Sequence, residues 1–185
     1  MRTLTLLLAL LLIPALAVNA QTLRFVDSEV SVEGTSTLHD WECGVTSFSG
    51  SMNVNGSGLA GIQEATVAIP VSAIDCDNRR MNNLVRDAFN ASQNPGITFN
   101  LTNAATTAGA NGWSVLTING VLEMNGTKQN VTLKLDGRQN GSGYEFRGSH
   151  TLNMTDFDMR PPTAMMGAVR TGQEVTIHFK LNARS

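Results

Sequence analysis

Apolar and polar residues alternate over many short stretches of the chain, and this is its most regular pattern. Between Glu174 and Leu181 every second residue is apolar, and polar residues such as Thr176 and Lys180 lie between. Because successive side chains of a strand point to opposite faces, each stretch predicts a β-strand with one apolar face. The pattern predicts strands at Leu23–Val26, Val30–Val32, Val45–Val54, Leu59–Ile74, Ile97–Leu101, Trp113–Met124, Val131–Leu135, Tyr144–Met154 and Glu174–Leu181.

Turn residues separate several of these strands and indicate antiparallel pairing. Asn125-Gly126 and the Asn-Gly-Ser-Gly stretches at residues 55–58 and 140–143 are typical of tight hairpins. Pro70 lies inside a predicted strand and has no N–H to donate, so we expect that strand to be an edge or to carry a bulge there. A long irregular stretch, Thr155–Gly172, precedes the last strand.

One segment between the strands has a helical pattern instead. Its apolar residues recur at intervals of three and four, which predicts a short amphipathic helix. Asp77 or Asn78 can cap its first turn. The apolar stripe consists of Met81, Leu84, Val85, Ala88 and Phe89.

Eight to nine strands and one short helix place the chain in the all-β class. An antiparallel sheet of this size must close into a barrel or stack on a second sheet. The helix between strands favours a closed eight-stranded barrel with the helix across one end or against its wall, and a two-sheet sandwich is the alternative. The interior of an eight-stranded barrel has room for one small ligand.

The N-terminal residues are typical of an export signal. Arg2 precedes the apolar run Leu4–Ile13, Pro14 ends that run, and Val18-Asn19-Ala20 resembles a cleavage site. The run is too short for a stable membrane span, which needs about 20 apolar residues. We therefore expect residues 1–20 to be removed and residues 21–185 to form one domain, periplasmic or secreted.

The charge of the chain is close to neutral. It has 13 basic and 15 acidic residues, for a formal charge of −2, and no run rich in Lys or Arg. A nucleic-acid-binding protein normally has a basic patch or stripe, so this composition argues against a nucleic acid partner.

Cys43 and Cys76 are the two cysteines of the chain. In an exported protein a pair of cysteines predicts one disulfide. If the strand Leu59–Ile74 pairs back along Val45–Val54, its far end brings Cys76 near Cys43. Two free buried thiols are the alternative, whereas a metal site is disfavoured because neither cysteine has a second Cys or a His at ligand spacing.

The stretch Ser36–Cys43 lies between two predicted strands and contains several residues that could bind a ligand or take part in catalysis. It contains Trp41, which is either a plug at one end of the core or the lip of a pocket. His39 and Asp40 are adjacent, so on a strand they point to opposite faces and cannot act as a base and its orienting acid.

Motifs of enzymes and cofactor sites are missing from the sequence. It has no G-x-S-x-G, no glycine-rich phosphate loop and no H-E-x-x-H. His150 and His178 are expected to point outward from their strands rather than to meet at a metal. The sequence therefore predicts no catalytic residues, no metal and no cofactor.

The order of the motifs points to a family. The chain contains, in sequence, Ser36–Trp41, Ile69–Ile74, Pro95–Phe99, Gly120–Thr127, Phe157–Pro162 and Val175–Phe179. This order and spacing resemble the YceI-like family over the whole mature chain. Asp158 departs from the family pattern, since a Gly is expected after Phe157, and the paired cysteines look like a feature of a subgroup.

The resemblance implies a lipocalin-like antiparallel barrel in the periplasm that holds a long isoprenoid chain. Such a ligand needs mainly a dry tunnel, because each buried CH₂ contributes about 0.8 kcal/mol. Ordinary core packing is the alternative for every apolar residue of the wall. The candidate ligand-binding residues are Trp41, Phe48, Ile69, Leu84, Phe89, Phe99, Leu116, Ile118, Leu133, Phe146, Phe157, Met165, Val175, Ile177 and Phe179.

Three functional hypotheses follow. The first is a carrier or store for an isoprenoid or another apolar lipid, without enzymatic activity. The second is a lipid-modifying enzyme that uses His39, and the third is a stress-protective protein that binds amphiphiles without selectivity. The sequence leaves a homodimer possible.

Overall fold

The computed structural model describes residues 20–56 and 58–185. The predicted signal peptide falls almost wholly on residues outside this range and stays a prediction. Within the described residues the chain is mainly β-structure. Its strands are β1 (Gln21–Ser36), β2 (Trp41–Val45), β3 (Ser49–Val54), β4 (Ile62–Pro70), β5 (Ile74–Asp75), β6 (Gly96–Ala108), β7 (Ser114–Met124), β8 (Thr127–Asn140), β9 (Gly143–Asn153), β10 (Thr163–Ala164) and β11 (Val169–Arg184).

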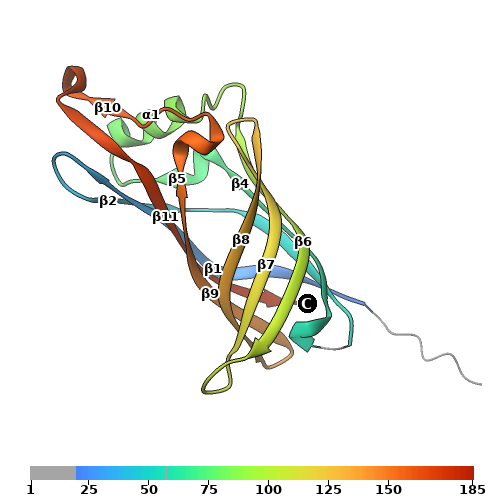
Figure 1. Cartoon of the computed structure of the whole chain (residues 1–185). Coiled ribbons are helices and arrows are strands. Elements are labelled where there is room, and N and C mark those ends of the chain that lie inside the picture. Colours follow the sequence, from blue (N-terminus) through green and yellow to red (C-terminus); the bar gives the residue numbers. More distant parts are fainter. Residues whose placement is uncertain (1–19, 57) are drawn as a thin grey trace, which may run out of the picture.

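Eight of these strands close into an antiparallel barrel, as the sequence predicts. The ring runs β1, β3, β4, β6, β7, β8, β9 and β11, and it closes because β11 pairs with both β9 and β1 (Figure 1). The short strands β2, β5 and β10 extend the sheet beyond the ring, at the end that carries the helix.

The first strand differs from its prediction because it is continuous. β1 joins the two predicted strands Leu23–Val26 and Val30–Val32 through a bulge, where Asp27 has a φ of 46°. The predicted strand Val45–Val54 is confirmed only over β3, because Val45 is the last residue of β2 and residues 46–48 are not in a strand. β2 pairs with the second half of β1 and β3 with the first half, so the chain steps across at residues 46–48, opposite the bulge region.

The predicted strand Leu59–Ile74 is also divided. It contains two short 3-10 helices, η1 (Gly58–Gly61) and η2 (Val71–Ala73), around β4, and it ends in β5. The expectation that Pro70 marks an edge or a bulge was wrong. β4 pairs on both sides, with β3 and β6, and Pro70 is tolerated because it is the last residue of the strand.

The predicted helix is present as α1 (Arg79–Ala88). Asn78 caps it, because its side-chain Oδ1 accepts hydrogen bonds from the backbone N–H groups of Arg80 at 3.0 Å and Met81 at 3.2 Å. The helix lies over one end of the barrel (Figure 1). No helix among the described residues has both the length and the apolar character needed to cross a membrane.

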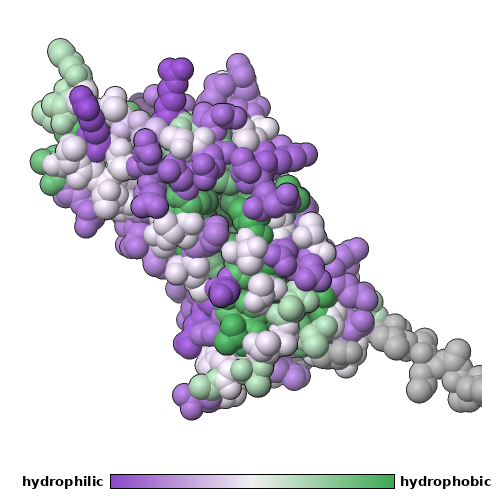
Figure 2. Space-filling model, viewed as in Figure 1, coloured by the Kyte–Doolittle hydropathy of each residue, from purple (hydrophilic) through white to green (hydrophobic). Residues whose placement is uncertain are grey.

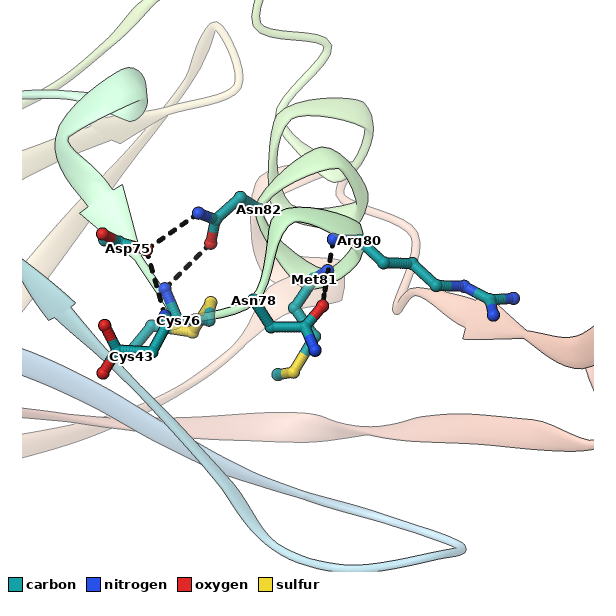
Figure 3. The surroundings of a disulfide bond; sticks show 8 residues. Cys43, Asp75, Cys76, Asn78, Arg80, Met81 and Asn82 are labelled. Carbon is teal, nitrogen blue, oxygen red and sulfur yellow. Dashed lines mark hydrogen bonds between the residues drawn. A yellow bond between two sulfur atoms is a disulfide. The ribbon is translucent and has the colours of Figure 1, made fainter.

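The predicted disulfide between Cys43 and Cys76 is confirmed. The pairing of β2 with β5 brings the two cysteines together, as the predicted hairpin topology requires. Asn82 links α1 to the segment that carries Cys76 (Figure 3). Its side chain accepts from the Cys76 N–H at 2.8 Å and donates to Asp75 Oδ1 at 2.8 Å.

The interior side chains form two separate clusters. One lies at the α1 end and includes Cys43, Leu122 and Val175, together with Phe157 of the 3-10 helix η3 (Met154–Phe157). The other includes Leu23, Met52, Leu116 and Phe146. Phe99 packs against both clusters, and residues of both line a cavity in the interior.

Candidate ligand-binding cavity

A cavity of about 300 Å³ occupies the barrel interior. Its wall is almost entirely apolar because alternate residues of the strands point inward, and these residues are Val, Ile, Leu, Phe and Met. The size and apolar lining are typical of sites for small hydrophobic ligands.

Most of the candidate ligand-binding residues line this cavity. They come from β2, β4, α1, β6, β7, β8, β9 and β11, with Phe89 just after α1, so the wall is assembled from the whole chain. Their contact with a ligand remains a prediction. The residues are Trp41, Ile69, Leu84, Phe89, Phe99, Leu116, Ile118, Leu133, Phe146, Val175, Ile177 and Phe179.

Three candidates do not line the cavity. Phe48 lies in the step between β2 and β3, outside the inward-facing positions. Phe157 is only 2% exposed, and it packs with the core cluster over the barrel end. Met165 begins the 3-10 helix η4 (Met165–Gly167) at the tip of the hairpin before β11, where its side chain is 62% exposed. Phe157 and Met165 lie outside the alternating stretches, and Phe48 lies in the predicted strand Val45–Val54 at the break between β2 and β3, so the pattern did not give the orientation of these side chains.

Trp41 combines the two roles that the sequence left open. Its indole N–H donates to the backbone carbonyl of Thr35 at 3.1 Å, which satisfies the polar atom of a plug. Its ring lies on Gly34, where an added Cβ would approach ring carbon Cζ2 to 2.4 Å, and the residue also lines the cavity. Trp41 is therefore fixed in place as part of the wall.

The apolar face of α1 forms the cavity wall at one end. Met81, Leu84, Val85 and Ala88 all line the cavity, yet no residue of the helix is fully buried. An amphipathic helix normally buries its apolar stripe in a packed core. Here Met81, Val85 and Ala88 pack against the core cluster at the same end and also line the cavity, so the stripe is shared between the core and the space that a bound apolar chain would fill.

His150 is the main residue that the sequence reasoning missed. It was expected to point outward, but it lines the cavity with Phe146 and Leu152. These three residues share one face of β9, so the alternation itself would have placed His150 inward had Phe146 been used to set the face. Burial lowers the pKa of the His150 imidazole below its ordinary value of 6.5, which favours the neutral ring.

The other two histidines lie away from the cavity. His178 on β11 has its Nε2 atom 2.9 Å from Oε1 of Glu33 on β1 and does not line the cavity. His39 lies in the turn between β1 and β2, and its ring Nδ1 is 2.7 Å from the backbone oxygen of Asp40. Both His39 and Asp40 are exposed, so the structure does not bring them to the apolar site.

Hydrophilic side chains gather over the end of the molecule that carries α1, while apolar patches show between polar groups along the barrel wall (Figure 2).

A comparison with known protein families gives a match over almost the whole described chain. The model of the YceI-like domain matches residues 19–183. This chain belongs to the YceI-like family. A comparison with curated protein sequences gives no match.

Solved structures with the same barrel include proteins from several bacteria. BcnA of Burkholderia cenocepacia has a TM-score of 0.68 at 24% identity, covering 84% of this chain and 95% of that one. A polyisoprenoid binding domain from Saccharophagus degradans has a TM-score of 0.65 at 13% identity, covering 88% and 98%. The YceI protein of Campylobacter jejuni has a TM-score of 0.62 at 15% identity, covering 76% and 82%. At these identities the similarity establishes the fold.

The departure from the YceI-like pattern at Asp158 has a conformational explanation. Asp158 has a φ of 55°, in the left-handed region that favours Gly and that Asp tolerates better than most residues. Its Oδ2 atom accepts a hydrogen bond from Thr127 Oγ1 at 2.8 Å. Asp158 therefore keeps the turn that a Gly would allow and adds a contact between the η3 loop and β8.

Proposed function

We propose that this protein is an exported lipid-binding protein that holds a polyisoprenoid or similar long apolar chain inside its barrel, as a carrier or store. The observation that carries this proposal is the apolar cavity lined by residues of both core clusters. A barrel meant only for stability would fill this space, because empty volume forfeits dispersion and transfer energy.

The family and its relatives support the chemical class of ligand. The structural neighbour from Saccharophagus degradans is described as a polyisoprenoid binding domain. An isoprenoid chain is flexible and apolar, so it can follow a cavity that extends from Leu116 to the α1 stripe. Burial of its carbons supplies affinity without many polar contacts.

Export to an oxidising compartment is the second part of the proposal. The disulfide Cys43–Cys76 supports it, because such bonds persist mainly in the periplasm or outside the cell. The signal-like pattern of residues 1–20 points the same way. We propose binding without catalysis, since His39 and Asp40 are exposed in the turn before Trp41 and are not among the described residues of the cavity wall.

A pair of variants on one strand tests the proposal. Leu133 lines the cavity, while Lys134 is its exposed neighbour on β8. We expect Leu133→Trp to occupy the cavity and reduce binding of a radiolabelled polyisoprenol at least tenfold, and Lys134→Trp to leave binding unchanged. Circular dichroism checks that both variants are folded. Equal binding by the two folded variants would contradict a site inside the barrel.

Competition separates a selective carrier from a protein that binds any amphiphile. A polyisoprenol and a fatty acid of similar carbon number are allowed to compete for the wild-type protein. A clear preference for the isoprenoid supports the carrier, whereas equal displacement by the fatty acid supports non-selective sequestration.

A further inference from the structure

His150 lies at mid-height of the barrel, on its inner face. It pairs with Ile177 across the β9–β11 ladder. On the same ladder, Leu152 pairs with Val175 in the cluster at the α1 end, and Phe146 of the other cluster pairs with Leu181. His150 thus lies between residues of the two clusters along this ladder, and it lines the cavity.

The ring of His150 is half-buried and has no hydrogen bond to another of the described residues. Among the described residues that line the cavity, His150 also carries the one ionisable side chain, and Ser31 and Thr171 are the other polar members of the wall. His150 is partly buried, and its ring nitrogens are not among the fully buried polar atoms, so they are accessible to a polar group of a molecule in the cavity.

We propose that His150 is the hydrogen-bonding anchor of the cavity and that the ligand carries an uncharged hydroxyl or carbonyl oxygen which reaches the middle of the barrel. The inference rests on the proposed lipid-binding function and adds a chemical requirement to it. The imidazole then determines which apolar chains bind best, because a pure hydrocarbon leaves its nitrogen atoms without a partner.

The surroundings favour an uncharged group over an anion. No Lys or Arg is among the described residues of the cavity wall, so a carboxylate or phosphate there would lose its hydration without a cationic partner. The low pKa of His150 keeps the ring neutral at pH 7, with one N–H donor and one acceptor nitrogen. A hydroxyl can use either nitrogen atom, and a carbonyl can accept from the donor.

Three ligands with the same C20 isoprenoid chain provide the test: the terminal alcohol geranylgeraniol, the hydrocarbon lacking its hydroxyl, and the corresponding carboxylic acid. Affinities are measured at pH 7.5 by displacement of the fluorescent probe N-phenyl-1-naphthylamine. We expect wild-type protein to bind the alcohol roughly tenfold more tightly than the hydrocarbon, the effect of about one hydrogen bond in a dry site. The acid is expected to bind more weakly than the alcohol.

Variants at His150 and His178 test whether His150 causes the preference for the alcohol over the hydrocarbon. In His150→Leu the alcohol and the hydrocarbon should bind equally well, with the hydrocarbon at least as tight as in wild type. His150→Gln keeps a hydrogen-bonding group and should retain part of the preference, which also serves if the Leu variant does not fold. His178→Gln, away from the cavity, should behave as wild type.

This design distinguishes a failure of the role proposed for His150 from a failure of the proposed lipid binding. If the hydrocarbon binds but His150→Leu keeps the preference for the alcohol, or if the acid binds best to wild type, the role of His150 is overturned while lipid binding stands. If no isoprenoid displaces the probe from wild-type protein, the proposed function itself is overturned. A change in the imidazole ¹⁵N chemical shift with the alcohol, absent with the hydrocarbon, would support the contact directly.

Discussion

The two ends of the barrel are built in different ways. At the end away from the helix, Leu23, Leu116 and Ala183 are completely buried, and short turns such as Asn111-Gly112 join the long strands. At the other end the strands give way to α1, a disulfide and the short strands β5 and β10 (Figure 1). Both ends contain a cluster of buried side chains, but one end is formed by the long strands and their turns, whereas the other is assembled from short elements.

This difference assigns stability and binding to different regions. At the end away from the helix, Leu23, Leu116 and Ala183 have no exposed surface, so their burial contributes strongly to folding. Leu84 of α1 lines the cavity without belonging to the core cluster, and Asn82 links the first half of the helix to Cys76 and Asp75. We therefore expect a ligand to pass through the α1 end, and mutations there to change affinity more than stability.

The largest expected effect is a contrast between two Leu→Ala variants. Leu23→Ala should lower the free energy of unfolding by about 2–5 kcal/mol, because Leu23 is fully buried in a packed cluster, does not line the cavity, and its truncation leaves a void. Leu84→Ala on α1 should lower it by less than about 1 kcal/mol, since that side chain already faces the cavity, and should weaken isoprenoid binding about fivefold. Urea unfolding and ligand titration measure the two quantities. Equal destabilisation would mean that the α1 stripe is packed as a core.

Removal of the disulfide is expected to have the second-largest effect on stability. The double variant C43S/C76S should lose about 2–4 kcal/mol, because the bond closes a loop with a sequence separation of 33 residues. Hydrogen exchange should show a larger loss of protection in α1 than in β7. An equal loss of hydrogen-exchange protection in α1 and β7 would contradict the view that the two ends of the barrel are stabilised separately.

The cap of α1 should have a smaller effect. Asn78→Ala removes the acceptor of two backbone N–H groups and should cost about 1 kcal/mol. Asn83 lies on the exposed face of the same helix, and Asn83→Ala should be close to neutral. Thermal melts of both variants provide the measurement, and similar melting temperatures would show that the cap contributes nothing.

The pH dependence linked to His150 is the smallest of these effects. Its pKa is lower in the folded protein than the ordinary 6.5, so the unfolded chain binds more protons in the window just below 6.5. Stability should therefore fall as pH decreases from about 6.5 towards the folded pKa, and His150→Leu should remove this part of the slope. Asp75 affects stability at lower pH. Hydrogen bonds from Asn82 and from the N–H of Asp77 lower the pKa of its carboxyl group. Its contribution to stability is therefore lost as the pH falls and the carboxylate is protonated.

Much of the fold could be predicted because alternation is a local property of the sequence. It gave the strands of the barrel wall, the period of α1 and, through the hairpin topology, the disulfide. The split between β2 and β3 could not be predicted, since it depends on how one long strand shares its edge with two partners. The status of Pro70 depends on the same kind of tertiary pairing.

The cavity itself was less predictable than its wall. Residues such as Ile118 and Leu133 have the same inward position whether they touch each other or a ligand, so residue types do not reveal empty volume. Phe157 and Met165 lie in segments without alternation, and their orientation depends on the loop conformation. His150 was misplaced because its polarity was given more weight than its register on β9.

Native mass spectrometry of the exported wild-type protein, before and after incubation with excess polyisoprenol, tests the central claim most directly. The account predicts one apolar chain per barrel, present on purification or taken up on incubation, and lost from Leu133→Trp. A folded wild-type protein that carries no such chain in either sample would contradict it.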